Sequence, residues 1–419
     1  MTLEDFEREK TPVEESVGWA KIATINIGTG ACLPMFVVAS ELAMSIGFIY
    51  SCLSALLASI FLSVIASFTG YTGAKSRVSS YMLVFNSFGK KYGKMLNILI
   101  ALTYIGWLSI SLAFFGEIMN VFMSKQFGIN LPVSLWIMFG GLLTLSSSIF
   151  GFKGIDIFSM IFVPLLLILL YMMIMPALKI NSFDIIMRTS GNGSISFGKA
   201  ISLMIGSFIV GAASMPDITR YCRTGRDGAV GSILGFIGGQ FVIALPCFIV
   251  ALGYQNADFI SVVIQHSTVV ALFILLTAMW SNNDNNLYAI ALSFATVFTN
   301  IKKVYLMKIV ITALGILLAC MEFVKLLIPF LSLLSIMIPS IAGLYVTDFF
   351  LNKIYGDRVS NTTNTVAILC WLIGSCTACL GYFDYITITT IPAVDGCVVS
   401  VLLYFMIDFL RKKLQFANN

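Results

Sequence analysis

The chain has 419 residues, of which 58% are hydrophobic and only 11% are charged, and its mean hydropathy is +0.96. A soluble domain has about 25% charged residues, so this composition excludes one and indicates a polytopic membrane protein embedded in a lipid bilayer. The net charge of +5 comes from basic residues scattered over short loops, which argues against nucleic acid as a partner.

Apolar runs of about twenty residues can cross a bilayer as helices, and the chain contains twelve of them. They lie near residues 18–43, 47–70, 95–122, 133–151, 155–177, 198–216, 229–253, 267–298, 304–322, 327–351, 364–382 and 386–410. A shorter apolar stretch, 79–89, is expected to form an interfacial helix. We therefore expect one transmembrane domain over residues 18–410, between an N-terminal tail of residues 1–17 and a C-terminal tail of residues 411–419.

The distribution of basic residues predicts the orientation of these helices. With twelve spans and the N-terminus inside, 20 of the 25 basic residues fall on the cytoplasmic side, Lys308 among them. The outer side keeps Lys125, Lys179, Arg188, Lys199 and Lys325. The positive-inside rule thus places both termini in the cytoplasm. Because the first sixteen residues do not form a cleavable signal peptide, we expect a bacterial inner membrane.

Two predicted spans contain residues that weaken a helix. The first carries Gly28, Gly30 and Pro34, and the sixth carries a glycine pair, Gly206 and Gly211, followed by Pro216. Interrupted helices at corresponding positions in two halves of a chain indicate a transporter site, where freed carbonyls can coordinate a cation. The spacing of five spans is the one that an inverted repeat requires. The alternative is that the glycines only allow close helix packing.

The eighth predicted span has six consecutive polar residues at its centre, Ser281 to Asn286, after Trp280. A charged side chain such as Asp284 costs about 2.5–3.5 kcal/mol at the middle of a bilayer helix. At about 100° per residue the six cover every side of the helix, so some must face other helices or a cavity. Such residues indicate a functional site, and the alternative is a set of interhelical hydrogen bonds.

A tryptophan, Trp107, lies in the middle of the third predicted span, away from the interfaces where tryptophan usually anchors a helix. Taken alone, it is as compatible with a core position as with a binding site. Together with the polar run and the interrupted helices, however, it resembles the nucleobase:cation symporter-1 family, and within it the bacterial cytosine permeases. The matching stretches, in order, are Gly70–Lys75, Ser87–Gly89, Gly106–Trp107, Gly206–Ile209, Trp280–Tyr288 and Ile338–Asp348.

The resemblance implies an all-α, leucine-transporter-like fold that works by alternating access. Two inverted repeats of five helices would occupy about residues 18–177 and 198–351, and two extra C-terminal helices about residues 364–410. The resemblance also implies a planar heterocycle stacked between Trp107 and Phe208, where stacking is worth about 1–3 kcal/mol per base. Asn283 would read the edge of the ring, backbone groups of Gly30, Ala31 and Cys32 would supply further contacts, and Asp284 would brace this network.

A sodium site is the second implication. It would use the backbone carbonyls of Gly28, Ala31 and Ala278 and the side chains of Ser281 and Asn282, which are oxygen ligands of the kind that hard cations prefer. Cytosine permeases tend to have two threonines where this chain has Ser281 and Asn282. They also tend to have a small hydroxyl residue at Val210. These departures leave the cation and the choice of cytosine open.

We therefore expect a monomeric secondary active transporter that imports a nucleobase such as cytosine, or a related planar heterocycle, together with sodium. One alternative is an importer of hydantoin- or allantoin-type compounds or amino acids on the same fold. Another is proton coupling with Asp284 as the carrier, and a third is a channel. The chain has no HExxH or GxSxG motif, and we do not expect an enzyme.

Overall fold

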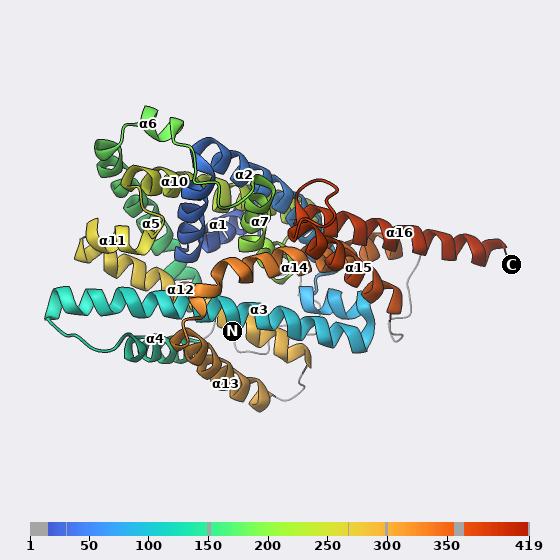
Figure 1. Cartoon of the computed structure of the whole chain (residues 1–419). Coiled ribbons are helices and arrows are strands. Elements are labelled where there is room, and N and C mark those ends of the chain that lie inside the picture. The colour runs from blue at the N-terminus through green and yellow to red at the C-terminus, as the bar shows by residue number, and fades with distance from the viewer. Residues whose placement is uncertain are drawn as a thin grey trace.

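The computed structural model describes residues 16–30, 32–148, 152–266, 268–297, 301–355 and 364–417. Within these ranges the regular elements are helices, and the only extended pairing is an isolated bridge between Val17 and Cys222 (Figure 1). In chain order the elements are α1 (Trp19–Gly30), α2 (Leu33–Ser76), α3 (Ser80–Phe127), α4 (Val133–Ser147), α5 (Phe152–Ile180), α6 (Phe183–Arg188), α7 (Phe197–Ala213), α8 (Pro216–Thr219), α9 (Gly225–Phe236), η2 (Ile237–Val242), α10 (Ile243–Tyr254), α11 (Phe259–His266), α12 (Val269–Val297), α13 (Ile301–Cys320), η3 (Phe323–Leu326), α14 (Leu327–Tyr355), α15 (Thr365–Tyr382) and α16 (Pro392–Ala417).

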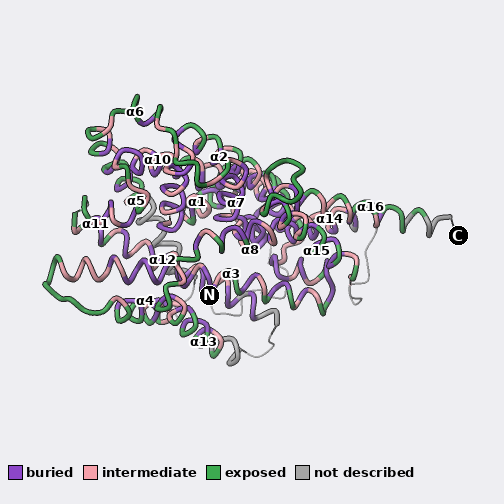
Figure 2. The backbone as a smooth tube through the Cα atoms, viewed as in Figure 1, coloured by how far each residue is buried: buried purple, intermediate pink, exposed green. Residues whose placement is uncertain are grey.

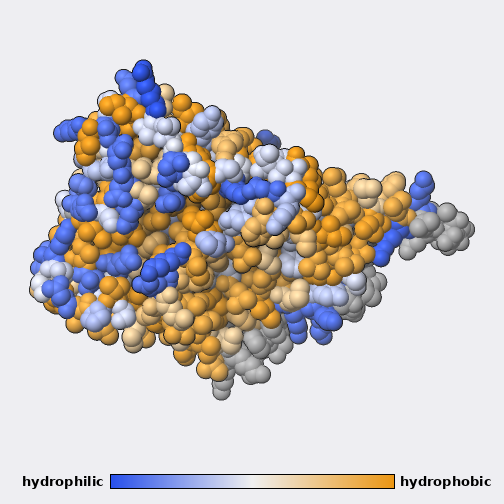
Figure 3. Space-filling view, in the orientation of Figure 1, coloured by the Kyte–Doolittle hydropathy of each residue, from blue (hydrophilic) through white to orange (hydrophobic). Residues whose placement is uncertain are grey.

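Membrane-spanning character is clear in much of this helical chain. Among the described residues, seven helical stretches are long and apolar enough to cross a membrane, and three shorter helices are also apolar. Each predicted span overlaps helical residues, although the last, predicted from residue 386, becomes helical only at Pro392. Large apolar side chains cover much of the visible surface (Figure 3), as expected for helices that face lipid. The number of twelve spans, their orientation and the inverted repeat remain predictions.

The two longest helices each contain a sharp bend at a glycine. Gly47 in α2 has φ 77° and ψ 172°, and Gly89 in α3 has φ 75° and ψ 171°. Residues other than glycine rarely adopt this conformation, so the helix direction changes there without a loop. Gly47 is the first residue of the second predicted span. The segment before Gly89, predicted to be interfacial, is helical, but Tyr81 and Phe88 are fully buried in the protein.

The predicted interruption in the first span is confirmed. Helix α1 ends at Gly30 and α2 begins at Leu33, while Cys32 between them has the extended values φ −131° and ψ 148°. Pro34 lies in the first turn of α2, where its missing N–H leaves no helical hydrogen bond unmade. A Cβ on Gly30 would lie 2.0 Å from the carbonyl oxygen of Gly239, so the end of α1 packs directly on the π-helical turn η2.

The predicted interruption at Gly206–Gly211 is wrong. Helix α7 runs without a break from Phe197 to Ala213, and the chain departs from it only at Ser214, before Pro216. Gly206 serves packing instead, because a Cβ there would lie 2.2 Å from the carbonyl oxygen of Leu331 in α14. Close backbone contact of this kind is the usual reason for small residues between membrane helices.

We expect Gly206→Ala to destabilise the protein by about 1–3 kcal/mol, because the added methyl group must push two helix backbones apart. Gly211→Ala is the matched control, since its Cβ would lie 3.8 Å from the nearest Phe236 atom and alanine favours helix by up to about 1 kcal/mol. Thermal unfolding of both variants in the same detergent measures the difference. An equal effect of the two substitutions would contradict the packing role of Gly206.

Helix α12, which carries the polar run, lies inside the bundle and packs against α3, α4, α5 and α13. Buried positions gather in the middle of the bundle and exposed ones along its outer surface (Figure 2). The polar residues therefore meet protein on several sides, which satisfies the requirement that they avoid lipid.

Candidate functional site

A narrow cavity lies where the break between α1 and α2 approaches α12. Its lining combines the start of α2 with α3, α5 and α12, and consists of Cys32, Leu33, Pro34, Ser111, Leu166, Leu275, Ala278, Met279 and Asn282. The volume of the cavity is about 10 Å³, which is room for about one water molecule or a small ion. The cavity is thus too small for a heterocycle in this conformation.

Three of the predicted site residues meet at this cavity. Cys32, Ala278 and Asn282 all line it, and Asn282 is half-buried there. Of the other predicted cation ligands, Ser281 is buried beside Asn282 and Gly28 is half-buried in α1, but neither lines the cavity. Ala31 lies outside the described residues. The structure therefore brings the helix break and the polar run together, as the sodium prediction requires.

Asn283 is the most unusual side chain of the polar run. It is 1% exposed, and neither its amide oxygen nor its amide nitrogen has a hydrogen-bond partner among the described residues. An unpaired buried polar group costs about 1–3 kcal/mol, so native proteins keep few of them. An amide that can both donate and accept, held without partners in a membrane bundle, is what a ligand with a polar edge would need.

Two hydroxyl groups on α3, which the sequence interpretation missed, share this property. Ser109 and Ser111 are at most 1% exposed, and their Oγ atoms have no partner among the described residues. Ser111 lines the cavity and lies four residues after Trp107, on the same face of the helix. That spacing is the signal in the sequence that could have identified it.

The predicted stacking residues come from two helices that pack against the same part of α14. Trp107 in α3 contacts Phe330 edge-on, with ring centroids 5.6 Å apart. Phe208 in α7 contacts Phe236 of α9 in the same way at 6.2 Å, and Gly206, two residues earlier, abuts Leu331. Both rings are half-buried. Each has an aromatic neighbour that holds its orientation, and the ring pairs found among the described residues do not include one between Trp107 and Phe208.

Asp284 faces away from the cavity. It is about 200° around the helix from Asn282, and its Oδ1 accepts a 2.5 Å hydrogen bond from Ser147 Oγ at the end of α4. Ser147 Oγ in turn accepts a 3.0 Å hydrogen bond from Trp280 Nε1. This arrangement ties α12 to α4, while the bracing of the Asn283 network predicted for Asp284 stays a prediction.

Lys308 completes this polar network. Rather than lying in a cytoplasmic loop, it is inside α13, only 3% exposed, and its Nζ donates a 3.3 Å hydrogen bond to the carbonyl oxygen of Ser148. Asp284 and Lys308 therefore bind two adjacent residues at the end of α4 with opposite charges. Each reduces the penalty of burying the other.

We expect Asp284→Ala to destabilise the protein by about 3–5 kcal/mol, because it removes a buried negative charge that offsets the burial of Lys308 together with the acceptor of the Ser147 hydrogen bond. Asp384→Ala is the matched control, since it removes an exposed ion pair with Lys199, at 2.6 Å, which is worth about 0.2–1 kcal/mol. Thermal unfolding compares the two variants. Similar losses of stability would show that Asp284 has no bracing role.

Comparison of the sequence with known proteins shows that this chain is similar to integral membrane permeases. A profile of permeases for cytosine/purines, uracil, thiamine, allantoin matches residues 11–392. The cytosine permease of Escherichia coli (strain K12) is 26% identical over 328 residues, which cover 77% of this chain and 76% of the relative. The hydantoin permease of Microbacterium maritypicum is 24% identical over 247 residues, covering 53% and 50%.

Solved structures share the fold. The inward-facing conformation of Mhp1 superimposes with a TM-score of 0.80 at 19% identity, covering 99% of this chain and 95% of Mhp1. Mhp1 in a closed conformation with bromovinylhydantoin bound gives a TM-score of 0.78 at 18% identity, with 95% and 93% coverage. The chain is a secondary transporter by class. It belongs to the nucleobase:cation symporter-1 family.

Proposed function

We propose that the protein imports a nucleobase such as cytosine, or a closely related planar heterocycle, together with sodium. The observation that carries this proposal is Asn283, a buried amide with no partner among the described residues. Its donors and acceptor match the polar edge of a pyrimidine, while Trp107 and Phe208 supply aromatic faces. A transporter that closes around such a ligand would pair these groups.

The proposed cation position is the cavity between the helix break and α12. Its size suits one small ion, and the Asn282 side chain and the Ala278 region supply the oxygen atoms that a hard cation prefers. Because the cavity touches both the start of α2 and α12, an ion there would fix these helices relative to each other. This provides a physical link between cation binding and the shape of the substrate site.

A thermal-shift experiment tests both parts. Purified protein is heated with cytosine, uracil, hydantoin, allantoin or an amino acid, in sodium chloride or in choline chloride at equal ionic strength. Ligand at 100 times its Kd should stabilise the folded state by about 2.7 kcal/mol, and we expect a nucleobase to do so more strongly in sodium. Stabilisation by the amino acid alone would contradict the proposed substrate class.

The same experiment separates the cation from the substrate. We expect Asn282→Ala to lose the effect of sodium, and Asn285→Ala, on another side of α12, to keep it. If stabilisation by cytosine responds to pH but not to sodium, the coupling ion is a proton instead of sodium.

A related substrate class is the hydantoins. The similarity to the Microbacterium maritypicum hydantoin permease supports it, and a hydantoin ring presents the same kind of planar edge to an amide. Stabilisation by hydantoin rather than cytosine would assign the protein to that group while retaining the roles of Trp107 and Asn283.

A further inference from the structure

A fully buried amide, Gln240, lies beside the helix break and has no part in the proposed function so far. It belongs to the π-helical turn η2. Its Oε1 accepts a 3.2 Å hydrogen bond from Ser59 Oγ of α2. Its Nε2 donates to α7, at 2.5 Å to the carbonyl oxygen of Met204 and at 3.3 Å to Ser207 Oγ. One side chain thus joins η2, α2 and α7 inside the bundle.

The turn that carries Gln240 interrupts an otherwise regular helix. The segments before and after η2 are the α-helices α9 and α10. Pro246 in α10 has no N–H to donate to the carbonyl oxygen of Val242, the last residue of η2, so the helix is weakened there. Single π-helical turns are rare and occur frequently at functional sites. Contacts with neighbouring helices therefore hold η2 in its wide form.

The end of α1 rests on this turn without a side chain between the two backbones. A Cβ on Gly239 would lie 2.8 Å from the carbonyl oxygen of Asn26, just as one on Gly30 would meet Gly239. Because interiors are closely packed, a shift of the end of α1 must displace Gly239 and with it the adjacent Gln240. The end of α1 is also one side of the break, whose residue Cys32 lines the proposed cation cavity.

The other end of the network reaches the predicted stacking ring. Met204 and Ser207 form the turn of α7 directly before Phe208. Phe208 also meets the ring of Phe236, the residue immediately before η2. Ser207 Oγ lies 3.7 Å from Sδ of Met35 in the first turn of α2. The Phe208 turn is therefore joined to η2 twice and to the start of α2 once.

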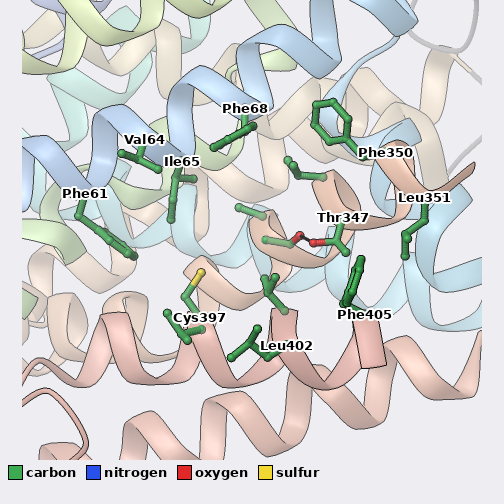
Figure 4. Close-up of a pocket in the computed structure, with 15 residues that line it drawn as sticks. Phe61, Val64, Ile65, Phe68, Thr347, Phe350, Leu351, Cys397, Leu402 and Phe405 are labelled. Atoms are coloured by element: carbon green, nitrogen blue, oxygen red, sulfur yellow. Dashed lines mark hydrogen bonds between the residues drawn. The ribbon is translucent and has the colours of Figure 1, made fainter. Parts of the chain in front are cut away.

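Ser59 fixes the direction of the Gln240 amide from the inner face of α2. Figure 4 shows Phe61, Val64 and Phe68 of α2 beside an apolar groove shared with α14 and α16. These three residues are about 140–200° around the helix from Ser59, so the groove and the network occupy opposite faces of α2. By holding the amide oxygen, the Ser59 hydroxyl directs the amide N–H groups of Gln240 towards α7.

We propose that Gln240 is a positioning residue that couples the cation cavity at the helix break to the stacking ring of Phe208. The inference rests on the proposed function, because it needs a cation at the break and a heterocycle at Phe208. An ion that shifts the end of α1 displaces η2, and Gln240 carries this displacement to the turn before Phe208. Coupling is reciprocal, so each ligand tightens the binding of the other. A buried amide that only joined helices would stabilise the fold without this effect.

Equilibrium binding of radiolabelled cytosine to the purified full chain measures the coupling, as the ratio of the Kd in choline chloride to the Kd in sodium chloride. We expect a ratio of about 5–150 for the unmodified protein and of about one for Gln240→Met, which keeps the length of the side chain without its polar atoms. Asn97→Leu is the matched control, since it removes another fully buried amide, one that donates to Tyr81, and should keep the unmodified ratio. The unmodified ratio in Gln240→Met would overturn the coupling role.

A smaller substitution tests the same link with less risk to folding. Ser59→Ala removes one oxygen atom and should lower the ratio about fivefold, the factor that one neutral hydrogen bond is worth. Thr347→Ala is its control, because Thr347 lies at the groove (Figure 4) and donates to Gly343 of its own helix at 2.7 Å. Equal ratios in these two variants would overturn the role of the Ser59–Gln240 contact.

Hydrogen exchange without cytosine separates this role from the proposed function. We expect sodium to slow amide exchange at the helix break in every variant, but to slow exchange in the α7 peptide around Phe208 only when Gln240 is present. Equal slowing of the α7 peptide in Gln240→Met would overturn the coupling while leaving the cation site intact. If sodium changes exchange nowhere in the unmodified protein, the proposed cation is wrong and the role of Gln240 is overturned with it.

Discussion

Asn283→Leu should abolish binding of the heterocycle while raising the thermal stability of the empty protein. Leucine has the same branched outline as asparagine and no polar atoms, so it removes two buried groups that have no partner among the described residues. Each such group costs about 1–3 kcal/mol, and the greater volume of leucine offsets only part of that gain. Loss of the edge contacts should weaken binding at least 100-fold, because a site deprived of matched polar groups rejects a polar ligand strongly.

The opposite signs of these two effects make the prediction specific. A residue that merely holds helices together would lose stability and binding together. Thermal unfolding without ligand and equilibrium binding of radiolabelled cytosine measure the two quantities on one preparation. The matched control is Asn285→Leu, at a half-buried position of the same helix, which should leave binding intact. A less stable Asn283→Leu protein that still binds cytosine would contradict the assignment.

Trp107→Ala should reduce uptake by about 10- to 100-fold without unfolding the protein. An aromatic face contributes about 1–3 kcal/mol to the binding of a base, and each 1.4 kcal/mol is a factor of ten. Trp107 is half-buried and meets Phe330 in a T-shaped rather than a stacked arrangement, so Phe330 leaves at least one face of the indole uncovered. Uptake of radiolabelled cytosine into cells or vesicles, normalised to the amount of folded protein, measures the effect.

Conservative replacement separates stacking from packing. Trp107→Phe retains an aromatic face and should recover most of the uptake, whereas Trp107→Leu fills space without stacking and should not. Trp19→Ala provides a control for loss of an indole at an exposed position. If the Trp107→Leu variant transports as well as the Trp107→Phe variant, the indole ring of Trp107 only packs in the protein core and does not stack on the substrate.

The sequence allowed the main features of the fold to be predicted because their signals are local. Pro34 and the flanking glycines indicated the break between α1 and α2, and this break is present. The polar run predicted that α12 would lie inside the bundle. Gly206 and Gly211 carried an ambiguous signal, since glycine can loosen a helix or allow close packing, and only the approach of Leu331 decides between the two.

The partners of the polar residues could not be predicted, since they depend on helices distant in the chain. Asp284 was expected to brace the site, but its contact with Ser147 required knowledge of how α4 meets α12. Lys308 was counted with the cytoplasmic residues because it is near the start of an apolar run, whereas it is buried within α13. Ser111 was missed because a single hydroxyl in a membrane helix is common.

Accumulation in proteoliposomes is the most direct test of sodium-coupled nucleobase import. Purified protein is reconstituted, and uptake of radiolabelled cytosine is followed with an inward sodium gradient and an inside-negative membrane potential. Coupling to one charge is worth about 2.3 kcal/mol per 100 mV, or about fiftyfold accumulation. We predict saturable accumulation above the external concentration that collapses when choline replaces sodium. Non-saturable uptake that stops at the external concentration would contradict a sodium-coupled transporter and indicate a channel.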